Sequence, residues 1–431
     1  MRVLVVGSGA REHALVTRLA AEVASDDIIC APGNPGISSQ ARTVPVDVSK
    51  PDEIVALAAR ERIDLTVVGP ELPLSVGIAD RFATEGRLLF GPTAAAARLE
   101  SSKAFAKAFM SRHHVPTARF RTCDSYDDAI ACVRSGEFDL PVVLKADGLA
   151  AGKGVVIARD RSEAEGAIAA AMREHRFGSA GSRLVIEECL TGPEVSFFVL
   201  CDGARALFIG SAQDHKRIFD DDQGPNTGGM GAFAPSPLAG PGLREQVMRG
   251  IVDPVISGMA AEGHPFQGFL YVGLMLTSSG PQVIEFNVRL GDPEAQVILP
   301  AMVDSFAPLL AAAAAGELRS SECTLSAERH VGVVLASRGY PGSAESGRPI
   351  QGIESAERLD VTVLHGGTAI VNRQLVTAGG RVLTVVGHGK TFSAAAAHAY
   401  EGVAQVFFEG MQFRRDIGRK AIAAEALPID R

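Results

Sequence analysis

Short apolar runs alternate with amphipathic stretches over the first hundred residues of the chain. The apolar runs cover residues 3–6, 28–30, 65–68 and 88–90, and several of them end in glycine or proline turns. Apolar runs of this length predict strands, and the stretches between them have a helical spacing. This alternation is typical of a parallel sheet with helices on its faces, in which ligands bind at the carboxyl ends of the strands.

The pattern changes after residue 100. A helix is predicted over 103–114, ending before Pro116, and strands over 142–145, 155–158 and 184–187. Ser162 and Glu165 have the spacing of a capping box for a helix over 164–175. Residues 191–320 alternate strand-like runs with long loops, which are usually functional in a compact domain. The last segment has β-runs at 331–336, 361–364 and 382–386 and a helix from Ser393.

Three domains are therefore expected, in a fold that mixes α/β and α+β architecture. The first covers residues 1–100, the second covers 101–327 with a subdomain at about 117–190, and the third is a β-rich domain over 328–431. A length of 431 residues suits three domains.

Composition and charge exclude several classes of protein. The chain has 42 Lys+Arg against 50 Asp+Glu, a formal charge of −8, so no general basic field attracts nucleic acid or an anionic membrane. The six cysteines form no C-x-x-C pair, which favours free thiols in a reducing compartment. The apolar stretch 297–315 contains Asp304 and two prolines, so it does not suit a membrane span, and Arg11 and Glu12 come too early for a signal peptide. A cytoplasmic protein is expected.

The glycine-rich segment 7–12 follows a strand and opens a helix. Its amides could receive a phosphate or carboxylate at the amino terminus of the helix. A structural turn without a ligand remains the alternative. A dinucleotide site is less favoured, because Glu12 occupies the third glycine position and Asp47 lies too far along the chain for a ribose-binding acid.

Residues 145–155 carry a stronger signal. Two predicted strands flank a loop with glycines, and Lys145 and Lys153 bring positive charges to it. Glycine lets a backbone approach a polyphosphate closely, and lysine neutralises its oxygens. The spacing differs from a Walker loop, so a flap over phosphates is the predicted structure; an exposed hairpin with a solvated lysine is the alternative.

Two further strands carry polar groups suited to a nucleotide and a metal ion. Residues 186–194 could contact an adenine edge through the backbone and a ribose through Glu194, although a solvated strand end is the alternative. Glu285, Asn287 and Arg289 alternate along a predicted strand and so share one face. A carboxylate and an amide suit Mg²⁺, and a guanidinium can hold a carboxylate or phosphate; a solvated edge strand is the alternative.

Taken in order, these motifs resemble those of one family across essentially the whole chain: the glycinamide ribonucleotide synthetases of the ATP-grasp superfamily. The resemblance rests on segments 7–15, 31–34, 68–71, 145–155, 213–217 and 225–231, and above all on 289–294, Arg-Leu-Gly-Asp-Pro-Glu. It implies an ATP-grasp fold after a Rossmann-like amino-terminal domain. It also implies an ATP-dependent ligase that converts glycine to glycyl phosphate and transfers it to 5-phosphoribosylamine, in purine biosynthesis.

The resemblance also implies roles for individual residues. ATP would be bound by Lys103, Lys145, Lys153, Glu187, Glu188, Leu190 and Glu194, and Mg²⁺ or Mn²⁺ by Glu285 and Asn287. The substrates would contact Gly9, Asp214, Lys216, Gly229, Arg289 and Asp292. Within this set, Lys145, Asp214 and Arg289 are the expected catalytic residues, with Asp214 facing the glycine ammonium and Arg289 its carboxylate or acyl phosphate.

Other functions stay open at this stage. Another ATP-grasp ligase or a carboxylase would use the same nucleotide motifs with a different acid. An NAD-dependent oxidoreductase would leave segments 145–155 and 285–294 without a role, and a nucleotide sensor would release no phosphate in response to an amino acid. The expected partners are glycine and 5-phosphoribosylamine, with a transient contact to the preceding amidophosphoribosyltransferase, no nucleic acid and no membrane. A monofunctional monomer is expected.

Overall fold

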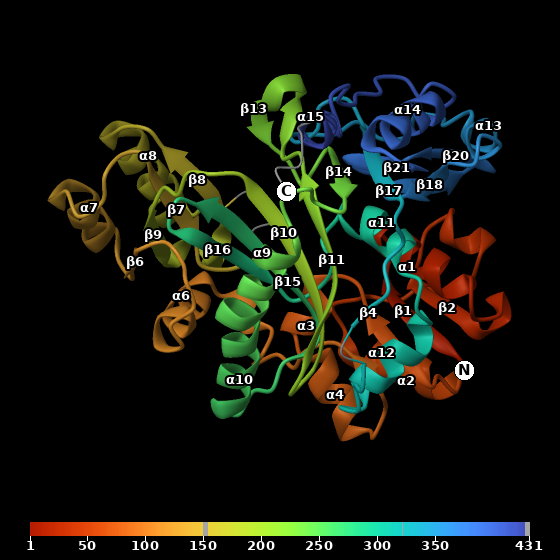
Figure 1. Cartoon of the computed structure of the whole chain (residues 1–431), viewed down its shortest axis with the longest axis horizontal. Helices are drawn as coiled ribbons and strands as arrows, with labels where there is room; N and C mark the ends of the chain where they lie inside the picture. Colours follow the sequence, from red (N-terminus) through yellow and green to blue (C-terminus); the bar gives the residue numbers. More distant parts are fainter. Residues whose placement is uncertain (150–153, 321, 427–431) are drawn as a thin grey trace.

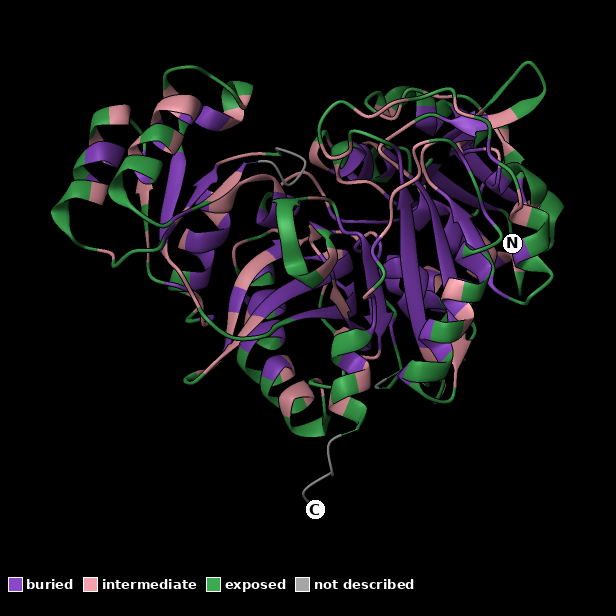
Figure 2. Cartoon of the chain, turned by 90° about the horizontal axis from the view of Figure 1, so that it is seen from above, coloured by how far each residue is buried: buried purple, intermediate pink, exposed green. Residues whose placement is uncertain are grey.

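The computed structural model describes residues 1–149, 154–320 and 322–426. Figure 1 shows the amino-terminal segment and the carboxy-terminal segment on one side of a long central sheet, and a small unit of strands and helices on the other side. In Figure 2 the strands are mostly buried, and the helices turn their exposed faces outward. The expected mixture of a parallel sheet, an ATP-grasp region and a β-rich last segment is confirmed.

The amino-terminal sheet is parallel throughout, in the order β3-β2-β1-β4-β5. Its strands are β1 (Val3–Gly7), β2 (Ile28–Pro32), β3 (Arg42–Thr43), β4 (Leu65–Val68) and β5 (Leu89–Phe90). Val3 and Val5 of β1 pack into one hydrophobic core, and Leu4 and Val6 pack into another. Because both faces of the sheet are covered, its strands are continuous apolar runs. The helices are α1 (Ala10–Ala20), α2 (Pro51–Arg60), α3 (Glu71–Ser75) and α4 (Ile78–Thr84).

The glycine loop after β1 packs around a buried carboxylate. Glu12 accepts the Gly9 N–H at 2.5 Å and is 2 % exposed. A Cβ at Gly69 would lie 2.0 Å from this carboxylate, and one at Gly7, whose φ is +130°, would lie 2.5 Å from the Glu12 side chain. The loops after β1 and β4 therefore need glycine for a close approach to Glu12.

The small unit is a four-stranded sheet in the order β6-β9-β7-β8, with two helices. It consists of β6 (Phe120–Cys123), α7 (Tyr126–Ser135), β7 (Val142–Ala146), β8 (Val155–Ala158), α8 (Arg161–Met172) and β9 (Leu184–Glu188). The capping box predicted at Ser162 and Glu165 is wrong by two residues. Asp160 caps α8 by accepting the Glu163 N–H at 2.8 Å, and Glu163 accepts the Arg159 N–H. An aspartate satisfies this motif as well as a serine, and nothing in the local pattern distinguishes the two positions.

A single eight-stranded sheet runs through the rest of the molecule, in the order β16-β15-β10-β11-β14-β17-β21-β18. Its strands are β10 (Glu194–Asp202), β11 (Ala206–Asp214), β14 (Gly231–Ala234), β15 (Gln267–Thr277), β16 (Gly280–Asn287), β17 (Arg329–Ala336), β18 (Thr362–His365) and β21 (Arg381–Gly389). All its pairings are antiparallel. The pairing of β14 with β17 joins the last segment to the central one, so the boundary expected near residue 328 falls inside a continuous sheet.

The remaining elements surround this sheet. They are the helices α5 (Arg98–Ser101), α6 (Lys103–Arg112), α9 (Pro241–Val247), α10 (Asp253–Ala261), α11 (Ala295–Ile298), α12 (Phe306–Ala314), α13 (Ile353–Glu357), α14 (Phe392–Val403) and α15 (Arg419–Glu425), and the hairpins β12 (Arg217–Phe219) with β13 (Gln223–Asn226) and β19 (Thr368–Val371) with β20 (Gln374–Thr377). The predicted helix from Ser393 corresponds to α14, but α15 follows it. Over the described ranges, no helix is both long and apolar enough to cross a membrane.

Buried histidines make the fold sensitive to acid. Burial lowers the pKa of His13 to about 3 and those of His215, His330 and His365 to about 4. An unfolded histidine has its usual pKa near 6.5, so the unfolded chain binds more protons than the folded one as the pH falls below about 6.5. The free energy of unfolding is therefore expected to fall from about pH 6.5 to pH 4, by up to about 1.4 kcal/mol per pH unit for each histidine.

His330 provides the matched variant for this prediction. It is 4 % exposed, and its Nδ1 has no hydrogen-bond partner among the described residues. His330→Phe keeps an aromatic ring and removes the titrating group, so its stability should fall less steeply, leaving a difference of about 2 kcal/mol at pH 5. Urea unfolding of both proteins at pH 7.5 and pH 5 measures this. Equal pH dependence in the two proteins would show that burial of His330 does not contribute.

Candidate active site

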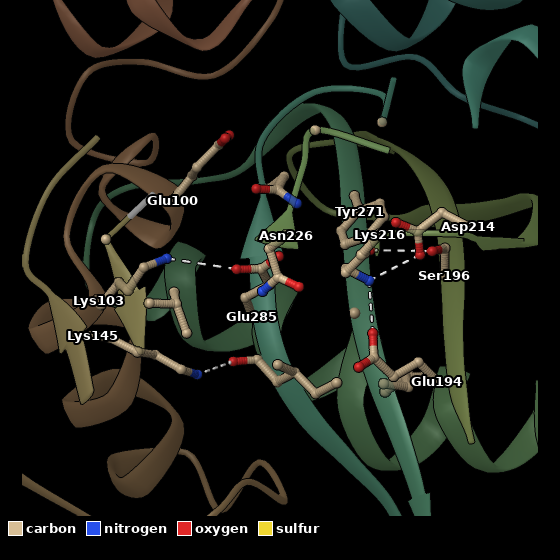
Figure 3. A pocket seen from close by; sticks show the side chains of 18 of the residues that line it. Glu100, Lys103, Lys145, Glu194, Ser196, Asp214, Lys216, Asn226, Tyr271 and Glu285 are labelled. Carbon is tan, nitrogen blue, oxygen red and sulfur yellow. Dashed lines mark hydrogen bonds and ion pairs between the residues drawn. The ribbon is translucent and has the colours of Figure 1, made fainter. Parts of the chain in front are cut away.

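A cleft of about 510 Å³ lies where the small unit, the central sheet and the amino-terminal segment meet. It includes twelve of the predicted site residues: Lys103, Lys145, Glu187, Glu188, Leu190, Glu194, Asp214, Lys216, Glu285, Asn287, Arg289 and Asp292. Figure 3 shows lysines and carboxylates from separate helices, strands and loops pointing into this space. Residues that lie nearly 200 positions apart in the sequence thus share one site.

Two lysines point into one end of the cleft. Lys103 is the first residue of α6, whose cap Ser102 accepts the Phe105 N–H, and its Nζ lies 3.6 Å from Glu285 Oε2. Lys145 lies on β7, and its Nζ is 2.9 Å from Glu187 Oε2 and donates to the Ile284 carbonyl oxygen at 3.0 Å. Both ammonium groups are held by the protein before any ligand binds. This arrangement favours a ligand that carries several negative charges.

Sequence reasoning missed Lys107, one helical turn after Lys103. Its Nζ lies 2.9 Å from Glu187 Oε2, and both side chains are 3 % exposed. Burial lowers the pKa of Lys107 to about 8, although the Glu187 carboxylate opposes this. Glu187 therefore holds two lysines, and this use of its side chain was not part of its predicted role on the adenine-binding strand.

The same end of the cleft has an apolar lining. Val143 of β7, Val155 of β8, Leu190 and Leu274 of β15 contribute to it. The Glu188 carboxylate accepts the Arg119 Nε–H at 2.8 Å. Its carboxylate is thus engaged, and the backbone after β9 remains beside the apolar lining. An apolar slot next to lysines suits a nucleotide base followed by phosphates.

Part of the predicted flap lies outside the described residues. Lys153 falls in the segment 150–153, which the structure does not describe. On either side of it, Gly148, Leu149, Gly154 and Val155 line the cleft. The two ends of the predicted loop therefore border the same space as Lys145.

Glu285 and Asn287 are neighbours on one face of β16. The pairing of β16 with β15 sets Glu285 opposite Gly273 and Asn287 opposite Tyr271. Burial acts to raise the pKa of Glu285, but the ammonium groups of Lys103 and Lys145 outweigh it and hold the pKa below its usual value. Its carboxylate is therefore ionised at neutral pH. A carboxylate and an amide oxygen on one strand face, both lining the cleft, fit the donor set that Mg²⁺ prefers.

Arg289 follows β16 and lies between two glutamates. Its Nε is 3.3 Å from Glu71 Oε2, and its Nη2 is 3.0 Å from Glu100 Oε1. The Glu100 and Glu71 carboxylates raise the pKa of Arg289 despite burial. Glu71 begins α3 and Glu100 lies on α5, so this guanidinium joins the amino-terminal segment to the end of the central sheet.

Lys216 bridges two carboxylates on the side of the cleft opposite Lys103 and Lys145 (Figure 3). Its Nζ lies 2.6 Å from Glu194 Oε2 and 2.9 Å from Asp214 Oδ1 (Figure 3). Burial acts to lower the pKa of Lys216, but Asp214 and Glu194 raise it well above its usual value. The Asp214 carboxylate, predicted to bind an ammonium group, thus already contacts one. Beside it, the hydroxyl oxygens of Ser196 and Tyr271 lie 3.1 Å apart.

The carboxy-terminal segment also reaches the cleft, which the sequence did not indicate. Arg381, the first residue of β21, donates to the carbonyl oxygens of Gly228 and Asp292 at 2.6 Å, and its Nη2 lies 3.2 Å from the Asp292 carboxylate. Arg11, the other unpredicted arginine of the lining, donates to the Leu290 carbonyl oxygen at 3.2 Å. The end of the cleft around Asp292 therefore contains two guanidinium groups, one paired with Asp292 and the other with Glu12.

Two predicted glycines are not part of the lining. The Gly9 N–H donates to Glu12, and a Cβ at Gly9 would lie 3.8 Å from Asp292 Oδ2. Gly229 has a φ of +111°, and its Cβ would lie 2.5 Å from Pro293 Cδ. Their neighbours Arg11 and Gly228 line the cleft instead. The absence of a side chain permits close packing against Pro293 at Gly229, and against Glu12, at 2.9 Å from its Oε2, at Gly9.

Comparisons with known proteins agree along the whole chain. The models of the phosphoribosylglycinamide synthetase N domain, ATP-grasp (A) domain and C domain match residues 1–100, 101–295 and 330–420. A phosphoribosylamine–glycine ligase of Xylella fastidiosa is 48 % identical over 429 residues, with 99 % of each chain covered.

Solved structures support the same grouping. The crystal structure of a phosphoribosylamine–glycine ligase from Thermotoga maritima has a TM-score of 0.85 and 33 % identity, covering 96 % of this chain and 100 % of that one. The biotin carboxylase domain of the Hydrogenobacter thermophilus 2-oxoglutarate carboxylase, solved with MgADP, has a TM-score of 0.70 at 19 % identity, covering 96 % and 91 %. The second likeness shows a shared fold.

Proposed function

The chain belongs to the phosphoribosylglycinamide synthetase family, and from this membership we propose how its cleft works. The protein is an ATP-dependent ligase that joins glycine to 5-phosphoribosylamine, giving glycinamide ribonucleotide, ADP and phosphate in purine biosynthesis. The observation that carries the proposal is the convergence of Lys103, Lys145, Glu285 and Asn287 at one end of a cleft whose other end holds Arg289 and Asp214.

We propose that ATP binds at the lysine end. The base would lie in the apolar slot next to Leu190, with Glu194 near the ribose, and Lys103 and Lys145 would contact the phosphates. The flap with Lys153 would then close over them, which keeps water from a reactive acyl phosphate. Phosphoryl transfer requires mainly positioning and charge neutralisation, and the preformed lysine contacts supply both.

Glu285 and Asn287 are the proposed ligands of a divalent cation, Mg²⁺ or Mn²⁺. Two protein oxygens suffice because the phosphates of ATP provide others. When bound, the cation neutralises charge on the transferred phosphoryl group. Lys103, at 3.6 Å from Glu285, keeps that carboxylate ionised and oriented toward the phosphates.

Glycine and the amine are proposed to bind at the other end. Arg289 would bind the glycine carboxylate, and later the acyl phosphate, through a bidentate pair of N–H donors. Asp214 would contact the glycine ammonium, which would replace part of the present contact between Asp214 and Lys216. The phosphate of 5-phosphoribosylamine would then lie toward Asp292, where Arg381 and Arg11 provide positive charge.

An omission experiment tests the proposal. Purified protein is incubated with ATP, glycine, a divalent cation and 5-phosphoribosylamine generated in situ, and glycinamide ribonucleotide is detected by mass. Product should form only when all four are present. Phosphate release with other acid and amine pairs, without this product, would contradict the substrate assignment and leave the nucleotide site in place.

A further inference from the structure

One carboxylate in the cleft differs from the others in its surroundings. Nine Asp and Glu residues line the cleft, and eight of them form an ion pair with a lysine or arginine. Glu294, at the end of the segment 289–294, is the exception among the described residues. It is 5 % exposed, and its side-chain contact is with a hydroxyl, since Ser196 Oγ lies 3.3 Å from Glu294 Oε1.

The chemistry of the ligation leaves one proton to be removed. The nitrogen lone pair of the amine attacks the carbonyl carbon of the acyl phosphate and forms the C–N bond. The nitrogen then carries a positive charge and must release a proton. The bond between the carbonyl carbon and the phosphate oxygen breaks, and its electron pair leaves with inorganic phosphate. A carboxylate engaged by a cation accepts a proton poorly, because the cation stabilises its ionised form.

We propose that Glu294 is the general base that accepts this proton from the attacking amine, an inference that rests on the proposed function. It lines the same cleft as Asp214 and Arg289, the groups proposed for glycine, and as Lys216. The proton passes from the amine nitrogen to the Glu294 carboxylate and then to solvent when the product leaves. Ser196 holds the carboxyl group in place through its hydroxyl group, which also lies 3.1 Å from the Tyr271 hydroxyl oxygen.

The electrostatics of the site support this role. Burial and the neighbouring Asp214 carboxylate raise the pKa of Glu294 to about 7, while Lys216 and Arg289 oppose them. Tyr271, which contacts Ser196, is a neutral hydroxyl, since burial holds its own pKa well above the usual value. A base with a pKa close to the working pH accepts a proton and releases it again readily.

Glu294→Gln separates this role from glycine binding. The amide keeps the size of the side chain but cannot take the proton, so formation of glycinamide ribonucleotide should fall by about 10²–10⁴-fold. Formation of the acyl phosphate does not need the base. It is measured by replacing the amine with excess hydroxylamine and detecting glycine hydroxamate. A second hydroxylamine molecule accepts the proton in this reaction, so the rate and the KM for glycine should stay within about threefold of the unsubstituted protein.

The outcomes are distinct. Normal ligation by Glu294→Gln overturns the inference, as does a parallel loss of hydroxamate formation and glycine affinity, which would make Glu294 a ligand of the glycine ammonium. If the unsubstituted protein forms no glycinamide ribonucleotide, the proposed function itself fails. Glu357→Gln, an exposed carboxylate on α13 outside the cleft lining, is the matched control and should change neither rate.

Ser196→Ala gives a second, independent readout that does not remove the carboxylate. The hydroxyl stabilises the ionised form of Glu294, so its loss should raise the pKa of Glu294. The rate of ligation rises with pH as the base loses its proton, and in Ser196→Ala this rise should move to higher pH. An unchanged pH profile in a variant that folds would contradict the inference even where Glu294→Gln is unstable.

Discussion

Lys145→Ala is expected to lower kcat/KM for ATP by about 10²–10³-fold, the usual effect of removing one preorganised donor to a charged transition state. The reason is the position of this lysine, buried on β7 with its ammonium fixed by Glu187 and by the Ile284 carbonyl oxygen. A flexible surface lysine would have to be ordered by the ligand, whereas Lys145 already points into the cleft. Steady-state kinetics with varied ATP measure the effect.

Lys107→Met is the matched control. Lys107 contacts the same Glu187 carboxylate but is absent from the cleft lining. Its loss should lower the free energy of unfolding, since a buried ion pair is broken, while kcat/KM for ATP changes by less than about tenfold. If Lys145→Ala keeps normal turnover, or if both variants lose ATP turnover equally, Lys145 has no direct role at the phosphates.

Arg289→Ala is expected to act on both activity and stability. Glu71 and Glu100 would lose their shared guanidinium while remaining in the protein. Removing one partner of a buried ion pair typically costs about 3–5 kcal/mol, because the charge left behind is uncompensated. The substrate-side donor disappears at the same time, so kcat/KM for glycine should fall by about 10²–10³-fold. Urea unfolding and kinetics with varied glycine give the two numbers.

A double variant separates the two effects of Arg289. Burial raises the pKa of Glu100 even with Arg289 beside it, so this carboxylate is costly once the guanidinium is gone. Arg289→Ala combined with Glu100→Gln should therefore regain part of the lost stability without regaining activity toward glycine. Recovery of activity together with stability would show that Arg289 acts only as a structural residue.

Local patterns predicted most of the fold. The continuous apolar runs of β1 and β4 indicated a sheet covered on both faces, and both strands are fully buried. The alternation of Glu285 and Asn287 along β16 indicated a polar face, and both line the cleft. In these cases the period of the side chains in one element sets their direction, and this period is visible in the sequence.

Contacts between distant segments were not visible in the same way. Glu71, Glu100 and Arg381 enter the cleft from separate parts of the chain, and no local pattern distinguishes them from solvated charges. Nor could the sequence indicate that Glu294 forms no ion pair among the described residues. This depends on which carboxylates the lysines and arginines reach in three dimensions. The joining of β17 to β14 likewise comes from strand pairing between segments about a hundred residues apart.

The most direct test of the central claim follows an oxygen atom. If the cleft uses ATP to activate the carboxylate of glycine, one carboxylate oxygen passes to the phosphate that is released. With glycine labelled by ¹⁸O in its carboxylate, the account predicts inorganic phosphate carrying one ¹⁸O for each glycinamide ribonucleotide formed. Product formation with unlabelled phosphate would contradict activation through glycyl phosphate and, with it, the roles assigned to Lys145 and Arg289.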